Sequence, residues 1–92
     1  MDALIQKIET IQNKQKSLQW GHYNMNDSEI MFAVGNKAYP KEPHYFIVSS
    51  NYSLCLLDNS HKKYIYKEYT DSPSVINGVI GLLKEWFPAK QL

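Results

Sequence analysis

The chain has 92 residues, 43% of them hydrophobic and 13% aromatic, with ten basic side chains against nine carboxylates. A chain of this length supplies one hydrophobic core, so we expect a single domain over residues 1–92, and the apolar content excludes a disordered polar chain. The formal charge of +1 excludes a strong long-range attraction to polyanions or anionic lipid.

All ten basic side chains are lysine. Arginine makes the bidentate contacts that read guanine edges, so its absence disfavours sequence-specific recognition of DNA. A chain rich in lysine, asparagine, isoleucine and tyrosine but without arginine is typical of AT-rich genomes and of their phages.

The only cysteine is Cys55, so an intramolecular disulfide is excluded and nothing indicates an oxidising compartment. No apolar run approaches the roughly 18 residues that a membrane span needs. The first residues, MDALIQKIETIQ, also lack the basic start and apolar block of a signal peptide. We therefore expect a cytoplasmic protein with no membrane partner.

Residues 2–18 have the spacing of an amphipathic helix, with apolar side chains on one narrow stripe and polar side chains elsewhere. Such a helix needs another surface to cover. The near-heptad spacing also permits a homodimer formed through this helix. The stripe consists of Leu4, Ile8, Ile11 and Leu18.

Five strands are predicted to follow the helix, because the next segments are rich in aromatic and β-branched residues and are separated by turn formers. Two prolines make residues 36–43 a loop, since proline cannot donate to a strand ladder. The predicted strands are residues 20–25, 29–35, 44–50, 52–58 and 62–69.

The chain is predicted to end in a second helix, with Ser72 as its N-cap, Pro73 in the first turn and Pro88 as the stop. Gly78 and Gly81 each cost roughly 1 kcal/mol inside a helix relative to alanine. Either another group packs closely against the helix backbone at these glycines, or the glycines serve no structural purpose. The helix has one broad apolar face, made of Val75, Ile76, Val79, Ile80, Leu83, Trp86 and Phe87.

The order α-β-β-β-β-β-α with short links predicts an α+β fold, a two-layer sandwich in which both terminal helices cover one face of a mostly antiparallel meander sheet. The other face is then left to water or to a partner.

The segment KKYIYKEYT, residues 62–70, has three interpretations. It is an ordinary strand whose lysines deter edge-to-edge aggregation, it belongs to an aromatic surface that binds another protein, or the same surface stacks the bases of single-stranded nucleic acid. Strand alternation places Lys63, Ile65, Lys67 and Tyr69 on one side and Tyr64, Tyr66 and Glu68 on the other. The predicted partner-binding residues are Tyr64, Tyr66, Tyr69, Lys62, Lys63, Lys67, Tyr45 and Tyr52.

Catalytic and metal signals are weak. His22, His44 and His61 match no compact Cys/His spacing, and Cys55 lies in the apolar segment SLCLL, where a thiol is normally inert. Phosphate-binding glycine loops are absent from the sequence. We predict no catalytic residue, no metal and no cofactor.

The resulting hypothesis is a non-enzymatic protein-binding module of the type that phages and mobile elements use to inhibit or redirect a host protein, an inhibitor or adaptor. One alternative is an accessory protein that binds single-stranded nucleic acid through the same tyrosines and lysines. A second alternative is a small metal- or thiol-dependent enzyme built on Cys55 and the histidines.

Overall fold

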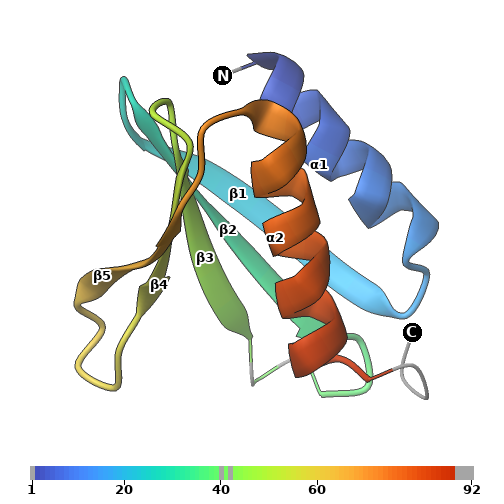
Figure 1. The fold of residues 1–92 in the computed structure, drawn as a ribbon. Helices are drawn as coiled ribbons and strands as arrows, with labels where there is room; N and C mark the ends of the chain where they lie inside the picture. The colour runs from blue at the N-terminus through green and yellow to red at the C-terminus, as the bar shows by residue number, and fades with distance from the viewer. Residues whose placement is uncertain (1, 40, 42, 89–92) are drawn as a thin grey trace.

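A computed structural model describes residues 2–39, 41 and 43–88. Five strands form one sheet in the order β1-β2-β3-β4-β5, with every neighbouring pair antiparallel. Both helices lie on the same face of this sheet (Figure 1), so the predicted α+β meander with one covered face is confirmed. The elements are α1 (Asp2–Lys14), β1 (Leu18–Asn26), β2 (Glu29–Asn36), β3 (His44–Ser49), β4 (Ser53–Leu57), β5 (Lys63–Glu68) and α2 (Ser72–Trp86).

The core lies between the helices and the sheet face they cover. Residues that are opposite each other in the register share a face, and Phe32 of β2 lies opposite Phe46 of β3. Their rings stack with centroids 5.0 Å apart. Full burial of such a side chain contributes about 1.5 to 3 kcal/mol. The helices contribute Leu4, Ile8, Val75, Val79, Leu82 and Leu83, and the strands Leu18, Ile30, Val34, Val48, Leu54 and Leu56.

The first helix is shorter than predicted. It ends at Lys14 rather than at residue 18, and a short-range bond from Gln15 N to Gln12 O tightens its last turn. Leu18 is buried as the first residue of β1, opposite Asn36. Leu18 fits the apolar spacing of the helix but belongs to β1. An apolar side chain can be buried equally well in a helix or in a strand, so its spacing alone did not decide between them.

The N-cap of the second helix lies one residue earlier than predicted. Asp71, not Ser72, is the N-cap, and its carboxylate accepts a hydrogen bond from Ser74 N at 2.9 Å. Hydrogen bonding from the Ser74 side chain, followed by the bond from the Ser74 backbone N–H, lowers the pKa of Asp71, because both favour the charged carboxylate. Pro73 lies in the first turn as predicted.

The predicted alternation of the last strand is wrong beyond its midpoint. Ile65 lies opposite Cys55, but Lys67 lies opposite Leu54, with a register shift between the two pairs. Because Cys55 and Leu54 are consecutive, they point to opposite faces. Ile65 and Lys67 therefore lie on opposite faces too, and Tyr66 is the extra residue of a β-bulge.

Candidate partner-binding face

The sheet face opposite α1 and α2, here called the open face, carries one apolar row that crosses all five strands. The register pairs Tyr23 with Met31, Met31 with Ile47, Ile47 with Cys55, and Cys55 with Ile65. These five residues, the apolar row, alternate along their strands with core residues such as Phe32 and Val48 and so point away from the helices.

The rows on either side of the apolar row differ in character. Toward one end of the sheet, Ala33, Tyr45 and Leu57 continue the apolar surface as far as Lys63 at the edge of β5. Toward the other end the side chains are polar, with Glu29 opposite Ser49 and Ser53 opposite Glu68. The open face is therefore apolar in the middle and polar along one margin.

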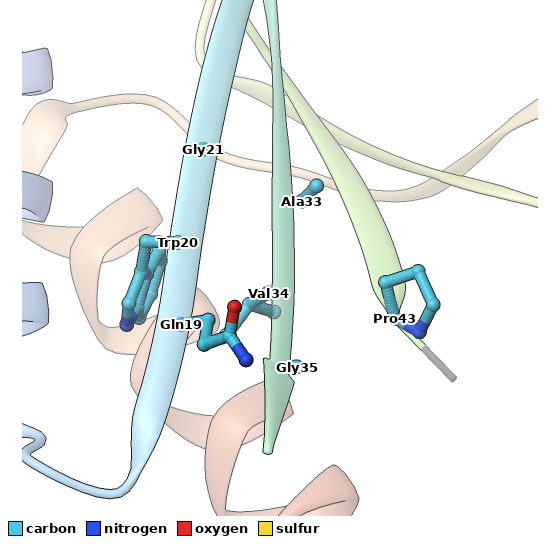
Figure 2. A pocket seen from close by; sticks show the side chains of 7 residues that line it. All are labelled: Gln19, Trp20, Gly21, Ala33, Val34, Gly35 and Pro43. Carbon is cyan, nitrogen blue, oxygen red and sulfur yellow. The ribbon is translucent and has the colours of Figure 1, made fainter. Parts of the chain in front are cut away.

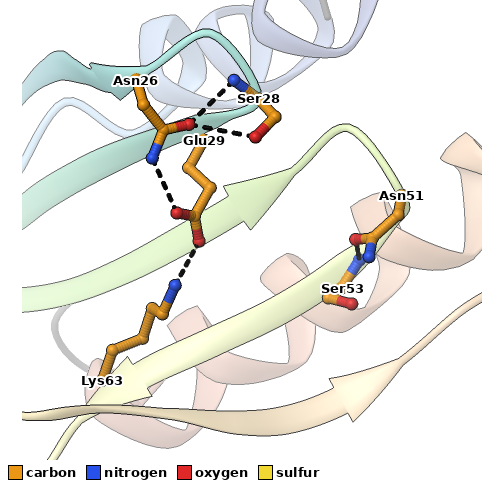
Figure 3. Close-up of polar contacts among 6 residues, drawn as sticks. All are labelled: Asn26, Ser28, Glu29, Asn51, Ser53 and Lys63. Atoms are coloured by element: carbon orange, nitrogen blue, oxygen red, sulfur yellow. Dashed lines mark hydrogen bonds and ion pairs between the residues drawn. The ribbon is translucent and has the colours of Figure 1, made fainter.

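An ion pair crosses the open face from the first residue of β2 to the first residue of β5. Lys63 Nζ of β5 donates to Glu29 Oε2 of β2 at 2.6 Å, and Asn26 Nδ2 donates to Glu29 Oε1 at 2.9 Å (Figure 3). In a flat sheet three strand spacings alone would separate these residues by about 14 Å. Their contact therefore shows that the twist of the sheet curls these two residues toward each other.

This curl covers the centre of the apolar row. The line from Glu29 to Lys63 crosses β3 and β4 at the level of Ile47 and Cys55, the pair opposite each other there. Ile47 is 0% exposed and Cys55 3% exposed, although the helices lie on the other face. The ion pair is partly exposed and adds little stability itself, so its effect is to close this part of the surface.

Glu29, Lys63 and the thiol of Cys55 beneath them shift one another's pKa values. The hydrogen bond from Lys63, followed by the one from Asn26, lowers the pKa of Glu29, and the same contact raises the pKa of Lys63. Burial raises the pKa of the Cys55 thiol, the positive charge of Lys63 opposes this rise, and the negative charge of Glu29 adds to it. A thiol in this setting is protonated and slow to react.

The ends of the apolar row are exposed. Tyr23 at the β1 end is 55% exposed and Ile65 at the β5 end is 58% exposed. The two exposed side chains lie on the two edge strands and are separated by the buried Ile47 and Cys55, so they form two separate apolar spots rather than one continuous patch.

A shallow depression adjoins the row at the β1–β2 end (Figure 2). It has a volume of about 180 Å³ and is lined by Gln19, Trp20, Gly21, Ala33, Val34, Gly35 and Pro43. It forms because small residues leave the sheet backbone uncovered. A Cβ placed on Gly21 would meet nothing within 4 Å, whereas one on Gly35 would contact Pro43 at 3.6 Å.

The eight residues predicted to bind a partner do not share one surface. Tyr45 and Lys63 lie on the open face. Tyr64 lies opposite Leu56 on the helix-side face. It lines a cavity of about 360 Å³ together with Tyr45, His44 and Trp86, so two of the predicted residues meet at this end of the sheet.

The remaining predicted residues lie at the bulge, in turns or against α2. Tyr66 is the bulged residue, and the Lys67 amine lies 5.6 Å from the centroid of the half-buried Tyr69 ring. Lys62 precedes β5, and Tyr52 occupies the β3–β4 turn with φ 68°. The apolar row contains Tyr23, Met31 and Ile65, which the sequence pattern did not single out. For Ile65, the sequence offered one signal, an isoleucine placed among tyrosines and lysines.

The histidines and Cys55 lie apart. His44 is on the helix-side face, stacked on Trp86 with centroids 4.7 Å apart, while Cys55 is on the open face. His22 contacts Phe32, and His61 is in the β4–β5 turn. Over residues 2–39, 41 and 43–88, no three His, Cys, Asp or Glu side chains are placed to hold a metal ion together.

Comparison with protein-family models, curated proteins and solved structures gave no match for this chain. Within the part of the chain that the structure describes, neither helix has the length and apolar character needed to cross a membrane.

Proposed function

We propose that this chain is a non-enzymatic protein-binding module whose partner docks on the open face. The observation that carries the proposal is the apolar row, which crosses the whole sheet on the face away from both helices and is bare at Tyr23 and Ile65. Interfaces are built from an apolar centre within a polar rim, and the polar margin at Glu29 and Glu68 fits this plan.

The partner's chemistry follows from the surface. Its contact must be apolar where it meets Tyr23, Met31 and Ile65, and it must offer polar groups where it meets the paired Lys63 and Glu29. The charges of this pair are neutralised by each other, so electrostatic steering is weak and affinity depends on close packing. The arginine-free composition supports extending the proposal to a phage-type or mobile-element-type inhibitor or adaptor acting on a host protein.

Nucleic acid is the less favoured ligand. Single-strand binding combines aromatic platforms with a positive groove. Here the charge of Lys63 is paired with Glu29, and Tyr23 and Tyr64 belong to strands at opposite edges of the sheet.

The test uses Ile65→Asp, which places a charge on the bare end of the apolar row. With the wild-type chain as bait in host lysate, we expect Ile65→Asp to weaken capture of the specific partner by about thirtyfold, the equivalent of losing an anchor worth 2 kcal/mol. The matched control is Tyr39→Asp, because Tyr39 is 62% exposed and lies in the loop after β2.

Circular dichroism of both variants is the control for folding, and both spectra should match that of the wild-type chain. Equal recovery of every partner by wild type and Ile65→Asp would overturn the proposal. Recovery of nucleic acid that falls steeply between low and physiological salt would favour the alternative instead.

A further inference from the structure

The two edges of the sheet are protected very differently. β5 carries Lys63, Lys67 and Glu68 together with a β-bulge, which are devices that keep an edge strand from pairing with another chain. β1 has the sequence LQWGHYNMN, with no charged residue and no proline. Its register is regular from residue 18 to 24, and the one irregularity lies at its end, between Asn24 and Asn26.

The outer edge of β1 also points to solvent. Residues 21–26 are all exposed, although α1, in the helix layer, lies on the same side of β1 as this outer edge in Figure 1. The exposed half of β1 is therefore accessible to another strand.

The hydrogen-bond pattern identifies which backbone groups point outward. Lys37 N donates to Ser17 O at 2.9 Å, so residues 17 and 37 form a hydrogen-bonded pair, and pairs of this kind alternate along an antiparallel ladder. Gly21 and Tyr23 then bond to β2, whereas the N–H and C=O groups of His22 and Asn24 point away from the sheet. The bond from Ser50 N to Ser28 O fixes the same alternation from the other side of β2.

We propose that two copies of this chain pair through β1 in an antiparallel arrangement about a two-fold axis at Tyr23. His22 of each copy lies opposite Asn24 of the other, and four backbone hydrogen bonds join them. The two Tyr23 side chains form the central, non-hydrogen-bonded pair, where cross-strand aromatic contacts are closest. The two five-stranded sheets become one continuous sheet.

A second copy fits this edge better than a charged strand does. β1 has no formal charge, so two copies approach without repulsion. The pairing also gives Tyr23, which is 55% exposed in the single chain, an aromatic neighbour. The apolar row of one copy then continues into the row of the other, so the dimer has one open face twice as wide. The contact is isologous, as closed dimers require.

The first experiment is disulfide trapping at the axis. A non-hydrogen-bonded antiparallel pair has Cα atoms close enough for a disulfide, so Tyr23→Cys should link two chains under oxidised glutathione. The control is Tyr66→Cys, at a residue 45% exposed on the opposite edge. We expect linkage through residue 23 to be faster by about tenfold or more, because pairing raises the local thiol concentration. The native Cys55 is buried, so it should not compete with either introduced thiol.

The second experiment measures assembly without a cross-link. Sedimentation of the wild-type chain should show a monomer–dimer equilibrium, and the double variant His22→Lys/Asn24→Lys should be monomeric, because it places like charges opposite each other. These two side chains lie on the helix-side face, opposite Phe32 and Ile30, so capture of a partner by the open face should be unchanged. Tyr66→Lys, which charges the other edge, should still dimerise.

A wild-type chain that sediments as a monomer at every concentration, with Tyr23→Cys linking no faster than Tyr66→Cys, would overturn the dimer while leaving the proposed function intact.

Discussion

At the scale of single residues, the contact between Glu29 and Lys63 has the widest consequence. The two residues belong to β2 and β5, and their bond at 2.6 Å holds the first residues of these two strands together over Cys55. The thiol is thus a native reporter of whether this bridge is closed.

Glu29→Gln should make Cys55 react several-fold faster with an aromatic disulfide reagent at neutral pH. Two effects act in the same direction. The loss of the ion pair opens the bridge, and the loss of the Glu29 charge removes one cause that raises the pKa of the thiol, so more thiolate is present. Asp27→Asn, in the exposed turn beside Glu29, is the control and should leave the rate unchanged. An unaltered rate in Glu29→Gln would show that the ion pair does not cover Cys55.

At the scale of elements, the two glycines of α2 have different explanations. A Cβ on Gly78 would overlap Tyr69, lying 2.8 Å from Cζ and closer still to the hydroxyl, whereas one on Gly81 would meet nothing within 4 Å. Gly78 therefore lets the chain after β5 pack against the helix, and Gly81 has no such role.

Gly81→Ala should stabilise the protein by about 0.5 to 1 kcal/mol through helix propensity alone. Gly78→Ala should destabilise it by about 1 to 3 kcal/mol, since overpacking exceeds that gain. Urea unfolding of the two variants measures both changes. If both alanines stabilise the protein equally, the packing of Tyr69 on α2 is not as described.

The number, type and order of the elements could be predicted because each depends on local signals, such as alternation, turn formers and a proline in a first helical turn. The errors lie where two elements compete for one residue. Leu18 satisfies the apolar stripe of a helix but is buried in β1, and Asp71 and Ser72 are both good caps.

The candidate site was harder to predict, because it depends on register between strands. One bulge in β5 moves Lys67 to the face opposite Ile65, and no pattern within residues 62–70 indicates it. The apolar row joins residues from five strands, so it becomes visible only when the pairings are known.

At the scale of the whole molecule, the protein is a two-layer sandwich whose helices occupy one side of the sheet (Figure 1). On the open face, the twist of the sheet buries the centre of the apolar row at Ile47 and Cys55. The two ends of the row, Tyr23 and Ile65, are exposed. A partner at the apolar row and a second copy at the β1 edge would use neighbouring surfaces, so a dimer would present two partner sites on one continuous sheet.

The most direct test is methyl NMR with a soluble paramagnetic reagent, which broadens side chains that solvent reaches. The methyl signals of Ile65 should broaden strongly. Those of Ile30, on the helix side, and of Ile47, beneath the ion pair, should be protected, as their exposures of 58%, 1% and 0% require. Ile65 signals as protected as those of Ile30 would show that the chain covers its own open face, which contradicts the account.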